Sequence, residues 1–439
     1  MQHLMSRRQA LSLLAGSAAT ALLPSIGIAE VQESTLPGKS RLSKADDDLL
    51  DDMERRACLY FVEQSGAATG QVLDRAAFYG NNGKRDPRTS ASIAATGFGL
   101  TALCIGDTRG YLPRAQARAQ VLRTLRFHAT SLPHEHGFFY HFNHIETGKP
   151  ESWSEVSSID TALLLCGVLT ARVHFSKDKE IVDLATTIYN RVDWPWLLRE
   201  GNVFSMGWRP KTGFIPSNWG HYCEMMMIPL LAIASPTHPV DPAVWSAFSR
   251  PRMQYKKFIY LSGSDPLFVH QYSHAYFDFR YKRDEFANYF ENSVIATRAH
   301  EQFCLDLGKP YSKDYWGISA SDSRTGYQAW GGPPKIGRLD GSVVPNAAAG
   351  SLPFRPNECL RVLRYLARRG DKVWGRYGFT DALNPELDWY NADVLGIDLG
   401  IGMLMAENLR SGFVWDTFSK NPEVSLAFSK AGFRPDKLL

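Results

Sequence analysis

Residues 159–175 read IDTALLLCGVLTARVHF, and residues 93–105 read IAATGFGLTALCI. Each stretch is long enough for several helical turns, and apolar residues cover nearly every side of the helix that it would form. Such a helix is stable only when other elements cover it all round. The two stretches therefore predict inner helices that are wrapped by an outer helical layer.

Helical periodicity continues through most of the chain. Long loops rich in glycine, proline and aromatic residues separate the helices, and strand patterns are confined to short hairpins at residues 138–143 and 202–206. The alternation of apolar and amphipathic helices predicts one all-α domain at residues 45–439, an (α/α)6 barrel with its aromatic-rich loops at one face. The expected helices span residues 46–63, 93–105, 114–129, 159–175, 180–191, 224–234, 242–258, 283–307, 356–369 and 392–408.

The first 29 residues have the pattern of an export signal. Arg7 and Arg8 precede an apolar stretch, and small residues at positions 27 and 29 mark a cleavage site. The paired arginines resemble a twin-arginine signal, which predicts a periplasmic or secreted protein with no stable membrane insertion after cleavage. Residues 30–44 are then expected to form a linker. The alternative is an N-terminal anchor that is retained.

Charge and cysteine content narrow the possible partners. The 439 residues carry 49 Lys+Arg against 45 Asp+Glu, and the basic residues are scattered, so a neutral substrate is expected and a nucleic acid is not. The sequence contains no CxxC or HExxH motif, so no metal or organic cofactor is expected. Buried free thiols are expected at Cys58, Cys104, Cys166, Cys223, Cys304 and Cys359.

Five acidic residues lie among apolar or aromatic neighbours. Hydrolysis of a glycosidic bond needs a protonated and an ionised carboxyl group, and burial helps to keep the first one protonated. Glu224, Glu155 and Asp398 are therefore candidate catalytic residues, and Asp160 and Asp381 are candidate substrate ligands. Each also has a structural alternative, such as a helix-start or capping carboxylate, a buried ion pair or a turn residue.

Aromatic and planar polar side chains are concentrated in the long loops. Sugar rings stack on aromatic faces, and planar polar groups bind their hydroxyls, so the combination favours a saccharide cleft. Trp219 and Trp330 in particular are expected to line sugar subsites. The candidate binding residues are Trp208, Arg209, Asn218, Trp219, His221, Tyr222, Gln271, Arg324, Tyr327, Trp330 and Trp389.

Several of these segments resemble the bacterial glucoamylase-like family that includes the endo-β-1,2-glucanases of glycoside hydrolase family 144. The matching segments include SEVSSIDTALLLCG, GFIPSNWGHYCEMMMIPLL, YWGISASDSRTGYQAWGGPP and IDLGIGMLMAENLRSG. The resemblance implies an (α/α)6 barrel and a β-1,2-linked glucan as substrate, and it places the family's candidate acids at Glu155, Glu224 and Asp398. After Asp398 the chain reads Leu399-Gly400-Ile401, where the family commonly has Gln-Gly-Pro.

The resulting hypothesis is an exported, endo-acting β-1,2-glucan hydrolase. Glu224 is the expected general acid, and Glu155 or Asp398 is expected on the base side. Three alternatives remain open at this point: a retaining transglycosylase with Glu155 as nucleophile, a polysaccharide lyase that uses Tyr272 and His274, and a glycan-binding protein without catalysis.

Overall fold

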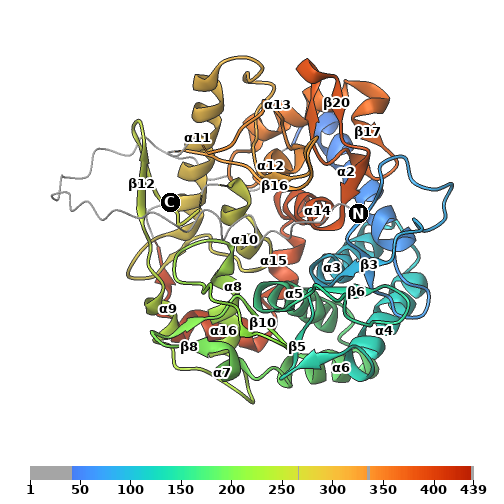
Figure 1. The fold of residues 1–439 in the computed structure, drawn as a ribbon, viewed down its shortest axis with the longest axis vertical. Coiled ribbons are helices and arrows are strands. Elements are labelled where there is room, and N and C mark those ends of the chain that lie inside the picture. The colour runs from blue at the N-terminus through green and yellow to red at the C-terminus, as the bar shows by residue number, and fades with distance from the viewer. Residues whose placement is uncertain (1–41, 265, 334–336, 437–439) are drawn as a thin grey trace.

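The computed structural model describes residues 42–264, 266–333 and 337–436 (Figure 1). The predicted export signal and the predicted linker up to residue 41 lie outside the described residues. The longer helices are α2 (Lys44–Glu63), α3 (Ile93–Arg109), α4 (Arg114–Thr130), α5 (Ser158–His174), α6 (Lys179–Asn190), α8 (Met227–Ile233), α11 (Tyr289–Leu307), α13 (Pro356–Ala367), α14 (Gly396–Arg410) and α16 (Pro422–Lys430). The shorter ones are α7 (Trp194–Leu197), α9 (Val244–Ala247), α10 (Tyr272–Tyr276), α12 (Pro345–Ala349), α15 (Phe413–Phe418) and the 3-10 turns η1 (Glu224–Met226), η2 (Leu267–His270), η3 (Gly370–Lys372) and η4 (Pro385–Leu387).

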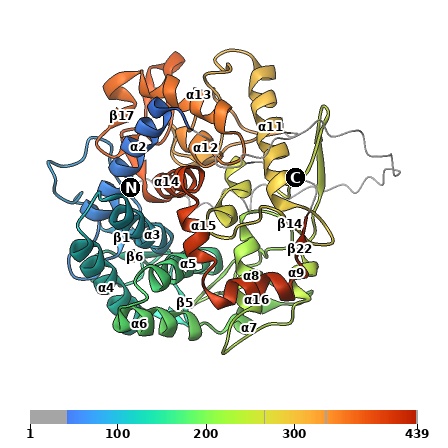
Figure 2. The same cartoon turned by 180° about the vertical axis from the view of Figure 1, so that it is seen from behind.

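The helices form an inner and an outer set (Figures 1 and 2). Helix α3 packs against both α5 and α14. In turn, α5 packs against α8, and α14 packs against α12. Nearly every residue of these inner helices is buried. Outside them, α2 covers α3 and α14, α4 and α6 cover α3 and α5, α13 covers α12, and α16 covers α8. The predominantly helical class and the burial of the two apolar stretches are confirmed.

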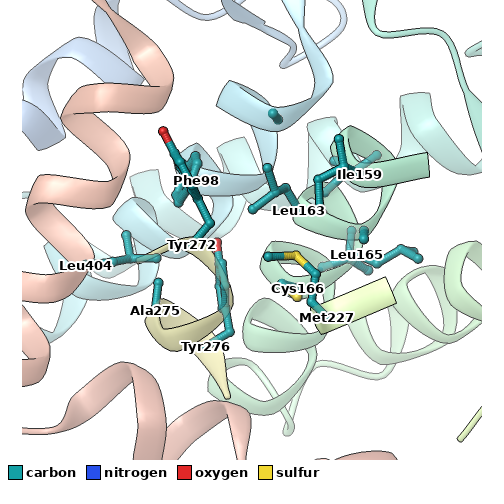
Figure 3. Close-up of a cluster of buried hydrophobic side chains, with 14 of the residues drawn as sticks. Phe98, Ile159, Leu163, Leu165, Cys166, Met227, Tyr272, Ala275, Tyr276 and Leu404 are labelled. Atoms are coloured by element: carbon teal, nitrogen blue, oxygen red, sulfur yellow. The ribbon is translucent and has the colours of Figure 1, made fainter. Parts of the chain in front are cut away.

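Two glycines explain why α3 and α5 pack so closely. A Cβ atom at Gly167 would lie 2.0 Å from the carbonyl oxygen of Gly97, and one at Gly97 would lie 2.4 Å from that of Leu163. The two backbones therefore touch, and no larger residue fits at either position. Beside this contact, Phe98, Leu163 and Cys166 belong to the buried cluster that Figure 3 shows.

Short strands lie between the helices, and three of them directly precede inner helices. The pairs and triplets are β1 (Val72–Leu73), β3 (Ser90–Ser92) and β6 (Phe142–His144); β7 (Val156–Ser157), β10 (Gly207–Arg209) and β11 (Gly213–Phe214); β2 (Arg75–Ala77) with β21 (Asp393–Leu395); β4 (His134–Glu135) with β5 (Phe138–Phe139); and β8 (Leu198–Arg199) with β9 (Val203–Phe204). The others are β12 (Arg252–Tyr255) with β13 (Phe258–Leu261), β14 (Lys282–Arg283) with β22 (Arg434–Pro435), β15 (Ala320–Ser321) with β16 (Gln328–Ala329), β17 (Trp374–Gly375) with β18 (Gly378–Phe379), and β19 (Leu383–Asn384) with β20 (Trp389–Tyr390).

Backbone hydrogen bonds place the N-terminal ends of α3, α5 and α14 side by side. His141 accepts a bond from the first residue of α3, and its own N–H donates to the Glu155 carbonyl, just before β7 and α5. Asp74 in turn donates to Ser90 before α3 and accepts from Gly396, the first residue of α14. Side chains at these three helix starts therefore share one end of the molecule.

Five predicted boundaries were wrong. The segment 242–258 forms only the short α9 before a β12–β13 hairpin, because Pro251 lacks an N–H and disfavours a helix before it. Helix α11 starts at Tyr289 instead of residue 283, since the side chain of Asn288 caps it. The predicted helix 392–408 starts at Gly396 because residues 393–395 pair with β2. The predicted hairpin at 138–143 is split, because β5 pairs with β4 and β6 pairs with β3. The predicted hairpin at 202–206 lies instead at 198–204, because β9 pairs with the preceding β8.

Two other expectations concern the whole chain. All six cysteines are buried and free, as expected. Within the described ranges, no helix is both long and apolar enough to cross a membrane.

Candidate active site

Asp160 and Asp398 occupy equivalent positions in the fold. Each is the third residue of an inner helix that directly follows a short strand, α5 after β7 and α14 after β21. The corresponding third residue of α3, which lies between these helices, is Ala95. Both aspartates are buried. The two isolated charges that the sequence places in apolar helices thus flank α3 at one end of the inner set.

The first group of charged residues, which we call the Glu155 cluster, consists of His141, Glu155, Asp160 and Arg209. The His141 ring lies between the two carboxylates: Nδ1 is 3.2 Å from Glu155 Oε1, and Nε2 is 3.4 Å from Asp160 Oδ1. Arg209 Nη2 is 3.7 Å from Glu155 Oε2. Arg209 belongs to β10, which pairs with the β7 strand that follows Glu155. Strand pairing therefore brings a cation to a buried carboxylate.

Neighbouring side chains hold this cluster in place. The Ser157 hydroxyl donates to the Asp160 carboxylate and accepts from its backbone N–H at 3.1 Å, so Ser157 is the N-cap of α5. The Phe142 ring stacks on the His141 ring with centroids 3.7 Å apart. Arg209 also donates to the Trp153 carbonyl at 3.0 Å. The charged groups thus lie between fixed, largely apolar walls.

The second group, which we call the Asp398 cluster, consists of Asp322, Asp381 and Asp398 with Arg75. Asp381 is hydrogen-bonded to Asp398, and it accepts a bond from the backbone N–H of Asp322 at 2.9 Å. Burial, together with the charges of Asp398 and Asp322, raises the pKa of Asp381 well above its ordinary value. Arg75 Nη1 lies 2.6 Å from Asp322 Oδ2. The pair formed by Asp381 and Asp398 is therefore suited to retain a proton at neutral pH.

Two neutral groups complete the Asp398 cluster. The Asn391 amide donates to Asp322 at 3.2 Å and lies 3.5 Å from Asp381. The Tyr272 hydroxyl lies 3.5 Å from Asp398 Oδ1. These donors reduce the cost of burying the carboxyl groups together.

Glu224 lies on a different element from the residues of both clusters. It is the first residue of η1, is buried, and leads into the apolar α8. The Ser273 hydroxyl donates to its carbonyl oxygen at 2.6 Å, which ties this turn to α10. Burial and the charge of Glu224 raise the pKa of the adjacent Cys223 thiol. The preceding loop is held against the start of α5, because the Trp219 indole donates to Ser158 at 2.8 Å.

Several of the predicted binding residues are built into the protein interior. Trp219 and Trp330 are only 2% and 3% exposed, and Trp330 donates to Ser321 at 3.1 Å. Tyr222 bonds to the buried His270, and Gln271 donates to Ala347 and Ser351. Tyr327 is also buried, whereas Trp208, Asn218, His221 and Trp389 are partly exposed and Arg324 is exposed. The structure brings Arg209 and Asp160 to Glu155, and Asp381 to Asp398; sugar binding by the others stays a prediction.

Sequence reasoning missed His141, Asp322, Arg75 and Asn391. His141 lies in the run FFYHFNH, where the aromatic neighbours gave no indication of a charged partner. Arg75 and Asp322 are 247 residues apart, and no local spacing could have joined them.

His141, Glu155 and Asp160 also have the spacing of a possible metal site, since their ligand atoms lie within 4.8 Å of one another. The two nitrogens of the His141 ring point to different carboxylates, and one ion cannot bind both nitrogens of a single imidazole. The expectation of no metal stays a prediction.

Comparisons with known proteins agree with the resemblance seen in the sequence. A family model described as "Glycoamylase: Putative glucoamylase" matches residues 216–422, which include Glu224 and the three aspartates of the Asp398 cluster. The crystallised endo-β-1,2-glucanase from Chitinophaga pinensis, in complex with sophorotriose and glucose, is 26% identical with a TM-score of 0.82. The match covers 90% of this chain and all of that one. The resemblance to the glucoamylase-like family is confirmed.

Two further relatives show the same relationship. A putative glucoamylase from Bacteroides fragilis is 29% identical, with a TM-score of 0.82 over 91% of this chain and all of that one. An exo β-1,2-glucooligosaccharide sophorohydrolase (non-reducing end) from Parabacteroides distasonis is 25% identical over 91% of this chain. The chain spans 60% of the length of that curated relative.

Proposed function

We propose that this protein is a glycoside hydrolase that cleaves β-1,2-linked glucan, and that it cuts within the polymer. The observation that carries the proposal is the end-to-end match with the Chitinophaga pinensis endo-β-1,2-glucanase. The exo-acting relative from Parabacteroides distasonis is a longer protein, of which this chain matches only part. The proposal of endo action follows the Chitinophaga pinensis enzyme, and the product pattern described below tests it against exo action.

We also propose that the inner helices close into the ring of an (α/α)6 barrel. The packing order α8, α5, α3, α14 and α12 supports this arrangement, and α10 contacts both α14 and η1, where the ring would close. The starts of α3, α5 and α14 then form one rim of the ring, with the two carboxylate clusters on it.

The two carboxyl roles of hydrolysis are assigned as follows. Glu224 is the general acid that protonates the leaving oxygen, because it is a buried carboxyl group at the start of an apolar segment. Glu155 acts on the base side, where it takes the proton of water or attacks the sugar, because Arg209 and His141 stabilise its ionised form. Asp398 is the second candidate on the base side.

The protein is further proposed to act outside the cytoplasm, in the periplasm or the medium. The support is the sequence pattern around Arg7 and Arg8. Replacing both arginines with lysines should retain the protein inside the cell, as fractionation would show. Unchanged export would contradict a twin-arginine signal and leave a general secretory one.

The test of the activity is incubation of the purified protein with linear and cyclic β-1,2-glucans, laminarin, starch and a uronate polymer. We expect new reducing ends from β-1,2-glucan alone, in a ladder of oligosaccharide lengths. Sophorose as sole product would indicate exo action, and chains longer than the substrate would indicate a transglycosylase. Binding without turnover would indicate a glycan-binding protein.

The lyase alternative is disfavoured by the surroundings of His274. Its ring packs against Phe279, Phe290 and Phe354, and Nε2 bonds to the Ser293 hydroxyl at 3.0 Å. Burial lowers the pKa of His274 to about 3, so it is a neutral residue of the interior. An unsaturated product that absorbs in the ultraviolet would restore the lyase.

A further inference from the structure

The histidine between the two carboxylates neither protonates the leaving oxygen nor activates water in the two-carboxyl mechanism. His141 is buried, as are Glu155 and Asp160 on either side of its ring. Its backbone is also fixed, because its N–H bonds to the Glu155 carbonyl and its carbonyl accepts from Ile93. A ring that is fixed in this way can hold the two carboxylates in a defined position relative to each other.

The ring geometry limits the protonation states of the cluster. Nδ1 is hydrogen-bonded to Glu155 at 3.2 Å, and Nε2 lies within ion-pair distance of Asp160, at 3.4 Å. An imidazole that carries hydrogen on both nitrogens, and is therefore positively charged, would serve both contacts. His141 and Arg209 together would balance the charges of Glu155 and Asp160. A buried group of this kind is stable only when its charges are paired.

We propose that His141 is a positioning residue that links Asp160 to Glu155 and holds the Glu155 carboxylate oriented and ionised for the base role. Asp160 acts through His141 and does not contact the substrate, which differs from the substrate-binding role expected from the sequence. The charged groups that face this unit are Glu155, Asp160 and Arg209, and the Ser157 hydroxyl fixes Asp160. The inference rests on the proposed glycosidase function.

The competing interpretation is a metal site made of the same three side chains. Arg209, 3.7 Å from Glu155, disfavours a cation there, because it would be repelled. The two nitrogens of the His141 ring also face different carboxylates, and one ion cannot bind both of them. Direct measurement separates the two interpretations.

The kinetic test compares His141→Gln, Asp160→Asn and the double variant with the wild type on linear β-1,2-glucan. We expect kcat to fall about 10–100-fold in each single variant, a part of what general base catalysis contributes. KM should change less than kcat. The double variant should lose little more than either single one, because both substitutions break the same link. In His141→Gln the acid limb of the kcat profile should move to higher pH, because Glu155 loses its hydrogen-bond partner.

The matched control is His174→Gln. His174 ends the same helix that Asp160 begins, and its Nε2 lies 2.7 Å from the Asp107 carboxylate, so it is also a largely buried histidine–aspartate pair. This variant should keep the wild-type kcat. Melting temperatures show whether each variant is folded, and His141→Asn provides a second variant if the glutamine is not tolerated.

A readout without substrate separates this inference from the glycosidase proposal. Relative to the wild type, the ring-nitrogen NMR signals of His141 should shift in the Glu155→Gln and Asp160→Asn variants. They should be unchanged in the His174→Gln variant. Failure of the glycosidase proposal would appear as a wild type without activity but with these coupled signals. The inference itself is overturned by folded His141 variants with wild-type kcat, by additive losses in the double variant, by uncoupled signals, or by activity that a chelator removes and a divalent ion restores.

Discussion

The starts of α5 and α14 each bury an aspartate, but in two different electrostatic environments. Both place an aspartate at the third position of an inner helix, next to a short strand. At α5, Asp160 and Glu155 face a histidine and an arginine. At α14, Asp398 faces a second carboxyl group, and the arginine of the cluster pairs with a third one, Asp322. Oppositely charged neighbours keep carboxylates ionised, whereas crowded carboxyl groups retain a proton.

The same local motif, an aspartate at the third position of an inner helix, can therefore be part of a site that accepts a proton or of a site that retains one. The Glu155 cluster is suited to accept a proton, and the Asp398 cluster is suited to retain one. In the proposed mechanism Glu224 donates the proton to the leaving oxygen. A proton on the Asp398 cluster would then have a structural role, because it lowers the cost of burying several carboxyl groups together. If Asp381 were the donor, the roles of Glu224 and the Asp398 cluster would be exchanged.

The largest expected effect tests this exchange. Glu224→Gln should lower turnover on natural glucan by about 10²–10⁴-fold, the contribution of general acid catalysis, while the fold survives. A substrate with a good leaving group needs less protonation and should be affected less. The basic limb of the rate profile should also disappear. The measurement is kcat against pH for Glu224→Gln and Asp381→Asn, and a larger loss in Asp381→Asn would move the donor to the Asp398 cluster.

Buried tryptophans beside the two clusters provide the next prediction. Trp219 bonds to Ser158 at the start of α5, and Trp330 bonds to Ser321, next to Asp322. Because both are buried, Trp219→Ala and Trp330→Ala should each lower the free energy of unfolding by about 3–5 kcal/mol. Chemical denaturation measures this loss. Variants of unchanged stability that bind oligosaccharide about 1–3 kcal/mol more weakly would instead establish both as sugar subsites.

Much of the helical fold could be predicted from the sequence, because an apolar run such as residues 159–175 is stable only inside a covered helix. Asp160 and Asp398 were identified for the same reason, as isolated charges in apolar segments. Their neighbours could not be identified. His141 is brought to the start of α5 by the bond from its N–H to the Glu155 carbonyl, and Asp322 reaches Asp381 through a loop, so tertiary contacts determine both partners. The β12–β13 hairpin was missed because its apolar residues also suited a helix.

A smaller effect is expected from the arginine of the Glu155 cluster. Arg209→Gln removes a cation near Glu155, and the His141 contact remains. We expect kcat to fall about 10-fold and the acid limb of its pH profile to move to higher pH, because a nearby cation favours the ionised carboxylate. Arg199→Gln is the control, since Arg199 lies over the Phe214 ring on a neighbouring strand. A loss confined to KM would indicate that Arg209 binds substrate.

The smallest effect concerns the proton held in the Asp398 cluster. The pKa of Asp381 is raised in the folded protein, mainly by burial and then by the charge of Asp398, whereas the unfolded chain has the ordinary value. Between these two pKa values folding takes up a proton, so the stabilising effect is complete below the ordinary pKa and is lost as pH rises. Asp381→Asn cannot titrate and should lose this dependence.

The difference in unfolding free energy, variant minus wild type, should therefore increase with pH, by up to about 1.4 kcal/mol per pH unit. Other buried acids with raised pKa values, such as Glu54, are present in both proteins, so their contributions cancel. Denaturation midpoints from pH 4 to pH 9 measure the slope, and Asp388→Asn, at a largely exposed ion pair with Lys372, is the control. A difference that stays constant with pH would show that Asp381 is ionised in the folded protein, and the contrast between the two clusters would then be wrong.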